Sequence, residues 1–186
     1  MGTARDRWLD EGLRVLASEG AAGVRIDRIA ARLGLSKGSF HHHFAGAEGY
    51  KRDLLARYEG LCVEVLDSAI AAVGANASAR AVLGVLTSVV GADGPDLYRP
   101  ELEVAVRAWA TSDAEVSAVQ RRIDTGRIEA LERVWRRAVP DPVEARRSAM
   151  VPYLLAVGAA VVVPPVGVED LRGMYEILLP LVPGAD

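Results

Sequence analysis

The segment GAAGVRIDRIAARLGLSKGSFHHHF, residues 20–44, contains the signals for two short helices joined by a tight turn. Apolar residues at helical spacing predict a helix over about 26–33, and the glycine that follows is suited to end it. Ser36 can cap a second short helix, in which Phe40 and Phe44 lie one turn apart and face inward together. This arrangement predicts a helix-turn-helix.

The outer face of the second helix carries polar side chains. With the phenylalanines facing inward, Lys37, Ser39, His41 and His42 are left on or near the surface, and Gly38 lets the backbone approach another molecule closely. A lysine can contact a phosphate or a base edge, and serine and histidine can donate hydrogen bonds. The pattern favours a helix that reads double-stranded DNA.

The three histidines of the chain are adjacent, which raises the alternative of a metal site. Successive helical residues point about 100° apart, so His41, His42 and His43 cannot converge on one ion, and helical metal pairs use i,i+4 spacing. A packing role is the second alternative, mainly for His43 against a neighbouring helix. We favour DNA contact by His41 and His42.

Charge is distributed unevenly along the chain. Residues 1–52 contain nine Lys/Arg and six Asp/Glu, whereas the remaining 134 residues contain 13 and 19. A basic N-terminal segment followed by an acidic remainder favours a nucleic-acid-binding module joined to a domain with a second function. Chance unevenness in a globular protein is the alternative.

Composition favours a soluble, cytoplasmic protein. Cys62 is the only cysteine, which excludes an intrachain disulfide and a structural Cys₂ or Cys₄ zinc site and fits a reducing compartment. The charge-free stretch 151–166 is interrupted by prolines and is shorter than the about 20 residues that a membrane span requires. We therefore expect no membrane partner.

Helical spacing continues through the rest of the chain without convincing period-2 alternation, which predicts an all-α fold of about nine helices. Capping signals mark three of the helix starts: Thr3 with Asp6, Ser112 with Glu115, and Asp141 before a proline. The expected helices span about 3–19, 26–33, 36–44, 48–73, 78–90, 100–111, 113–138, 141–163 and 168–179, with a loop at 91–100.

Residues 5–58 resemble the DNA-binding domain of the TetR family of transcriptional repressors, with Ser36-Lys37-Gly38 and the closing Phe44 at the family's spacing. A weaker resemblance, to the effector domain of one TetR subgroup, covers RPELEVAVRAWA and VQRRIDTGRIEALERVW. The resemblance implies a three-helix helix-turn-helix domain over residues 2–62. It also implies a helical domain for effector binding and dimerisation over residues 63–186.

The resemblance also implies which residues meet DNA. The implied contacts are Arg25 near phosphate, Lys37, Gly38 and Ser39 at the major groove, and His41 and His42 at phosphate or base edges. Two positions depart from the family: His41 replaces a tyrosine, and Ala47 replaces a lysine whose phosphate contact Lys51 is a candidate to restore. Because a protonated imidazole attracts phosphate, we expect DNA binding to tighten as the pH falls through about 6.5.

The acidic remainder of the chain, residues 53–186, contains no recognisable set of catalytic residues. It has no histidine, nucleophile elbow, phosphate-binding glycine loop or metal-ligand set, so we expect no catalysis, metal or cofactor. The resemblance implies a pocket for a small-molecule effector, which we expect to be apolar. Trp109 and Tyr153 are the candidate lining residues, and the alternative is that both are ordinary core aromatics.

The segment LLAVGAAVVV, residues 154–163, predicts dimerisation. A helix that is apolar all round must be buried, either in the monomer core or against a partner. The family places the homodimer interface in the last two helices. A two-fold dimer in turn predicts a palindromic operator.

Taken together, these features predict a ligand-responsive homodimeric regulator, a repressor that leaves its operator when a small molecule binds. Two alternatives remain open. The helix-turn-helix could serve as a surface for another protein, making the chain an adaptor. A small helical enzyme is the weaker alternative, since its site would have to be built from Arg, Asp and Glu alone.

Overall fold

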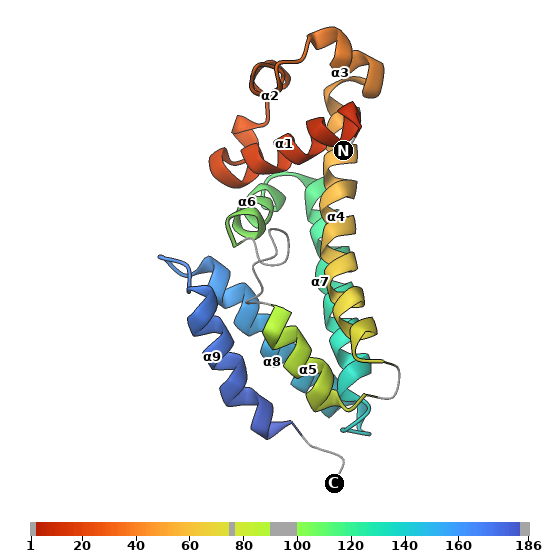
Figure 1. Ribbon diagram of the computed structural model, residues 1–186, viewed down its shortest axis with the longest axis vertical. Coiled ribbons are helices and arrows are strands. Elements are labelled where there is room, and N and C mark those ends of the chain that lie inside the picture. The colour runs from red at the N-terminus through yellow and green to blue at the C-terminus, as the bar shows by residue number, and fades with distance from the viewer. Residues whose placement is uncertain (1–2, 75–76, 90–99, 183–186) are drawn as a thin grey trace. The chain divides into compact units, whose positions relative to one another are not determined.

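The computed structural model describes residues 3–74, 77–89 and 100–182, and its regular elements there are all helical (Figure 1). The α-helices are α1 (Ala4–Glu19), α2 (Ile26–Leu33), α3 (Lys37–His43), α4 (Gly46–Ala72), α5 (Ala79–Val89), α6 (Pro100–Ala110), α7 (Ala114–Trp135), α8 (Pro142–Val161) and α9 (Val168–Leu178). The predicted all-α fold is confirmed. The loop expected at 91–100 falls, except for its last residue, outside the described ranges. No described helix is both long and apolar enough to cross a membrane.

Of the three helix caps predicted outside the helix-turn-helix, two form as expected. The Thr3 hydroxyl accepts a hydrogen bond from the Asp6 backbone N–H at 3.2 Å, and the Asp6 carboxylate accepts one from the Thr3 N–H at 2.9 Å. Asp141 accepts hydrogen bonds from the N–H groups of Val143 and Glu144 at the start of α8. Each cap satisfies amides that have no partner within their own helix.

The predicted capping box at Ser112 and Glu115 is wrong by one residue. Oδ1 of Asp113 accepts the hydrogen bonds from the backbone N–H groups of Glu115 at 3.0 Å and Val116 at 3.2 Å. The Ser112 hydroxyl instead donates to the carbonyl oxygen of Trp109 at 3.2 Å. The serine therefore bonds to a carbonyl group at the C-terminus of α6, and the aspartate that follows it is the N-cap of α7.

Two compact units make up the chain, and the division falls inside α4 and α7. The first unit comprises Met1–Leu61 and Glu101–Arg121, and the second comprises Cys62–Pro100 and Arg122–Asp186. The first unit thus contains α6 and the start of α7 as well as the helix-turn-helix. The predicted division after residue 62 assigned that segment to the C-terminal domain, and the functional extent of each domain stays a prediction.

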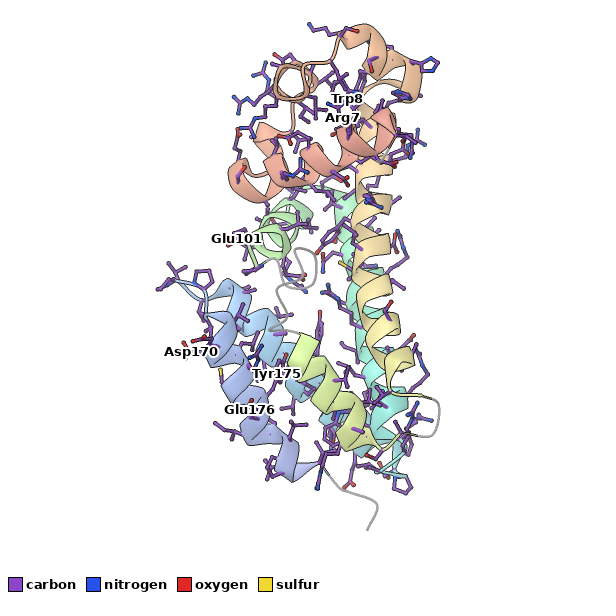
Figure 2. The ribbon with its side chains drawn as sticks, viewed as in Figure 1. Arg7, Trp8, Glu101, Asp170, Tyr175 and Glu176 are labelled. Carbon is purple, nitrogen blue, oxygen red and sulfur yellow. The ribbon has the colours of Figure 1, made fainter. Side chains whose placement is uncertain are left out.

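Four aromatic rings form the centre of the first unit. Trp8 on α1 is fully buried, and its ring centroid lies 5.2 Å from that of Phe40, 6.5 Å from Phe44 and 6.4 Å from Tyr50. The Tyr50 hydroxyl donates to the carbonyl oxygen of Trp8 at 2.7 Å, and burial raises the pKa of this phenol, which keeps it protonated as a donor. Figure 2 shows Trp8 on the side of α1 that faces α3 and α4.

The second unit has its own apolar core. Its buried members come from α5, α7, α8 and the C-terminal end of the described chain: Ala79, Val82, Leu83, Leu131, Val134, Trp135, Ala145, Ala149, Tyr153 and Val182. Polar contacts add to this packing. Tyr175, which lies on α9 (Figure 2), donates from its hydroxyl to the carbonyl oxygen of Pro152 on α8 at 3.0 Å. Arg80 donates to the carbonyl oxygen of Val182 at 2.6 Å.

Candidate nucleic-acid interface

The turn between α2 and α3 has the geometry that its sequence predicts. Gly34 ends α2 in the left-handed region, with φ 64°, and its N–H donates to carbonyl oxygens of α2. A residue with a Cβ pays a steric penalty in this region. Ser36 caps α3 by accepting a hydrogen bond from the N–H of Ser39 at 3.2 Å. The predicted helix-turn-helix is therefore present.

One face of α3 is anchored in the aromatic core, and the other is open to solvent. Phe40 is fully buried and Phe44 nearly so. The predicted contact residues divide accordingly: Lys37, Gly38, His41 and His42 are exposed, and Ser39 is half-buried. Because the buried side holds the helix in place, the exposed side chains project from a fixed backbone.

Arg25 stands apart from the other predicted contacts, at the residue before α2. Its guanidinium lies 3.5 Å from the Asp27 carboxylate, and both side chains are exposed. Five of the six predicted residues thus share α3, and the sixth begins the helix before it. Their contact with DNA stays a prediction.

The three histidines lie in different surroundings. The His41 ring packs edge-on against Phe40, with 5.4 Å between centroids, and the His42 and His43 rings stack edge-on at 4.9 Å. His43 is half-buried, with its ring centroid 6.2 Å from that of Phe44. Among the described residues, no group of three His, Cys, Asp or Glu side chains is arranged to hold a metal ion.

Acidic side chains neutralise much of the positive charge on α1 and α2. Glu19 pairs with both Arg28 and Arg32, and Glu11 lies 2.6 Å from Arg14 and 3.5 Å from Arg32. By contrast, the Lys37 ammonium makes no ion pair or hydrogen bond with any residue that the structure describes. Lys37 is therefore an exposed cation outside any ion pair at the first position of α3, with the Asp27 carboxylate of α2 as a longer-range electrostatic neighbour.

Lys51 is not free in the same way. Its side chain is 18% exposed, and its ammonium lies 2.7 Å from Asp113 and 3.0 Å from Glu115. The same ammonium lies 6.0 Å from the centroid of the Trp109 ring. These partners do not favour the phosphate contact that the sequence suggested for Lys51. Sequence reasoning missed the pairing because the partners lie more than sixty residues away along the chain.

The two candidate pocket residues belong to different compact units. Trp109 is half-buried on α6 in the first unit, with the Lys51 ammonium over its ring. Tyr153 is a nearly buried member of the apolar core in the second unit. Their place in an effector pocket stays a prediction, and the surroundings of Tyr153 agree with the alternative of a core aromatic.

Comparisons with known proteins identify a similar DNA-binding domain and a similar fold. A family model described as bacterial regulatory proteins, tetR family, matches residues 9–57. The HTH-type transcriptional regulator BetI of Rhizobium meliloti is 31% identical over 121 residues, which cover 64% of the chain and 56% of that protein. The match thus spans little more than half of this relative's length.

Solved structures match over nearly the whole chain. A TetR transcriptional regulator from Legionella pneumophila superposes with a TM-score of 0.79 at 13% identity, covering 99% of both chains. A protein from Saccharomonospora viridis described as a transcriptional regulator, crystallised in complex with choline, gives 0.78 at 21% identity, covering 95% of both. A TetR-family regulator from Streptomyces coelicolor gives 0.76 at 18% identity, covering 96% of this chain and 95% of that one. At these identities the likeness shows the fold.

Proposed function

We propose that the chain belongs to the tetR family of bacterial regulatory proteins, whose family model it matches over residues 9–57, and that it is a transcriptional regulator that binds double-stranded DNA through α3. One observation carries the proposal. The helix is capped by Ser36 and anchored by buried Phe40, and it presents an exposed, unpaired Lys37 beside exposed Gly38, His41 and His42.

The chemistry of this face suits a phosphate backbone and the edges of bases. The first turn of a helix points free N–H groups and a partial positive charge outward, and Lys37 adds a full charge at the same end. The hydroxyl of Ser39 and the imidazoles of His41 and His42 are hydrogen-bonding groups for the groove. Gly38 is exposed and has no side chain, so the backbone can approach another molecule closely there. Arg25 is proposed as a further phosphate contact.

We propose that the regulator is a homodimer joined through α8 and α9. Val151, Leu154, Gly158 and Val161 recur at helical spacing along α8, and all four are exposed. On α9, Ile177 is 72% exposed, with exposed Met174 one turn before it. A second copy that covers these stripes would remove apolar surface from water. Two-fold symmetry would then require a palindromic operator.

The proposed regulation is release from DNA when a small molecule binds the helical body, which makes the protein a cytoplasmic repressor rather than an enzyme. The effector must bind the DNA-incompetent state more tightly, by about 1.4 kcal/mol for each tenfold loss of DNA affinity. The sequence favours an apolar effector. Because a structural relative was crystallised with choline, quaternary ammonium compounds are a second class to test.

The test is selection of bound fragments from a random pool of double-stranded DNA at low and at physiological salt. We expect an enriched palindrome that survives physiological salt. We also expect Lys37→Ala to weaken binding to it and to lower the slope of log K against log salt by about one. Arg133→Ala removes another exposed cation, from α7 in the second unit, and serves as the matched control.

Two results would contradict the proposal. Binding that is erased at physiological salt, with and without candidate effectors, would favour the adaptor alternative, in which the helix-turn-helix meets a protein. Equal losses for the Lys37 and Arg133 variants would mean that DNA is held by net charge and not by α3.

A further inference from the structure

Lys51 lies near the start of α4, the helix that follows α3. Its ammonium donates a hydrogen bond to Oδ2 of Asp113 at 2.7 Å and forms ion pairs with Glu115 at 3.0 Å and Glu48 at 3.9 Å. Asp113 and Glu115 lie where α6 ends and α7 begins, the α6–α7 corner. All of these residues belong to the first compact unit. A single cation on α4 therefore joins a corner that lies sixty residues further along the chain.

Asp113 has two roles at this corner, one for each carboxylate oxygen. Oδ1 accepts the backbone hydrogen bonds that cap α7, and Oδ2 accepts the hydrogen bond from Lys51. The hydrogen bond to Lys51 lowers the pKa of Asp113, and the same bond raises the pKa of Lys51, so both groups stay charged near neutral pH. The cap and the ion pair are thus built from one side chain.

Tyr50, the residue before Lys51, connects α4 to a different helix of the first unit. The Tyr50 hydroxyl donates to the carbonyl oxygen of Trp8, which joins α4 to α1 within the helix-turn-helix domain. Two turns later the Tyr58 hydroxyl donates to Glu103 on α6 at 3.1 Å. The first half of α4 is therefore attached to the helix-turn-helix on one side and to α6 and the α6–α7 corner on the other.

We propose that Lys51 is a positioning residue for DNA binding, whose ion pairs with Asp113 and Glu115 hold α4, and through it α3, on the α6–α7 corner. The inference rests on the proposed function and adds to it a named link that sets the orientation of the recognition helix. The competing role is direct contact with phosphate, for which the Lys51 ammonium would have to leave both carboxylates.

The experiment compares operator affinity across a salt series for Lys51→Met, for the acid-pair variant Asp113→Asn/Glu115→Gln, and for the combination of all three substitutions. Asparagine keeps the capping group of α7, so this variant removes charge without removing the cap. A positioning role predicts that Lys51→Met and the acid-pair variant each weaken binding by about tenfold, with the salt slope unchanged. The variant with all three substitutions should then bind DNA no more weakly than Lys51→Met or the acid-pair variant, because the three side chains form one ion-pair network.

A phosphate contact predicts a different pattern. Lys51→Met would then lower the salt slope by about one, and the acid-pair variant would bind DNA more tightly, because it removes negative charge and frees the ammonium. Either result would overturn the inference. Arg52→Met is the matched control: it removes the adjacent, exposed cation, and its effect should add to that of the acid-pair variant.

Two further variants show whether a loss of binding results from misfolding. Two further outcomes show whether a negative result contradicts the proposed function or only the proposed role of Lys51. Lys51→Arg keeps the charge and should bind within about twofold of the wild type, whereas Glu115→Gln alone should give a smaller loss than the acid pair. If the wild type selects no operator, the proposed function fails. If the wild type binds and Lys37→Ala loses affinity, but Lys51→Met and the acid-pair variant do not follow the positioning pattern, only the role of Lys51 fails.

Discussion

At the scale of single residues, Gly12 marks a close approach of α1 to α4. A Cβ placed on Gly12 would lie 2.1 Å from the Tyr50 hydroxyl oxygen and 2.9 Å from a methyl carbon of Leu54. The hydroxyl cannot move away without losing its hydrogen bond to Trp8. Glycine is therefore required here for its lack of a side chain.

Gly12→Ala should lower the free energy of unfolding by about 1–3 kcal/mol, because it overpacks the contact and breaks the buried hydrogen bond. Urea unfolding followed by circular dichroism measures the change. Gly126→Ala on α7 is the control, since its Cβ would meet nothing within 4 Å and alanine favours the helix. Equal effects of the two substitutions would show that the contact with Tyr50 is unimportant.

His41 is a histidine of α3 whose removal should weaken DNA binding. Its ring is exposed, and it packs edge-on against the ring of Phe40. His41→Ala should weaken operator binding by about threefold to tenfold, because it removes an exposed hydrogen-bonding group from the proposed DNA-binding face. His43→Ala, which changes a half-buried ring, should weaken binding less. Fluorescence anisotropy at constant pH and ionic strength is the measurement, and equal effects of the two substitutions would contradict the prediction.

At the scale of elements, α7 begins at a side chain that also pairs with another helix. The hydrogen bond from Lys51 lowers the pKa of Asp113 below its ordinary value of 3.8. A carboxyl group with a lowered pKa in the folded protein contributes stability above its unfolded pKa and loses that contribution as the pH falls. The start of α7 is therefore a point at which acid weakens the fold.

The urea midpoint of the wild type should fall as the pH drops from 5 to below 4, and Asp113→Asn should reduce the size of this fall. The asparagine variant should be less stable than the wild type near pH 6, and the difference should narrow as the pH falls through the lowered pKa of Asp113, where the wild type loses the charged pair as well. Asp141→Asn, at the cap of α8, is the comparison without a lysine partner. Parallel pH profiles for wild type and Asp113→Asn would contradict the assignment.

At the scale of the whole molecule, the exposed apolar side chains on α8 and α9 support the proposed homodimer. Leu154 is 54% exposed on α8, and Ile177 on α9 is more exposed still. Buried leucine and isoleucine side chains each contribute about 1.5–3 kcal/mol relative to exposure. In a two-fold interface each such side chain is buried twice, once from each copy of the chain.

Leu154→Glu combined with Ile177→Glu should therefore shift the protein from dimer to monomer by light scattering after gel filtration. Binding to a full palindrome should then fall toward that of a half-site. Val63→Glu changes a residue of comparable exposure, 49%, on α4 and should leave the dimer intact. A monomeric wild type, or a dimer that survives the double substitution, would place the interface elsewhere or exclude it.

The sequence by itself determined the helices and the helix-turn-helix, because their signals act over three or four residues. Gly34 and Ser36 mark the turn, and the spacing of Phe40 and Phe44 divides α3 into a buried and an exposed face. These preferences belong to the local backbone and do not depend on what packs against it. The exposed residues of the candidate DNA-binding face were predictable for the same reason.

Only the tertiary structure decided which residue caps α7 and which of the two lysines forms ion pairs. Ser112 and Asp113 are both good capping residues, and the aspartate takes the role while its second oxygen is held by Lys51. Lys37 and Lys51 look alike in the sequence, yet among the described residues the Lys37 ammonium on α3 forms no ion pair, whereas the Lys51 ammonium is paired with carboxylates of the α6–α7 corner. The physical reason is that an ion pair depends on distance in space, and folding alone brings groups from remote parts of the chain within a few ångströms.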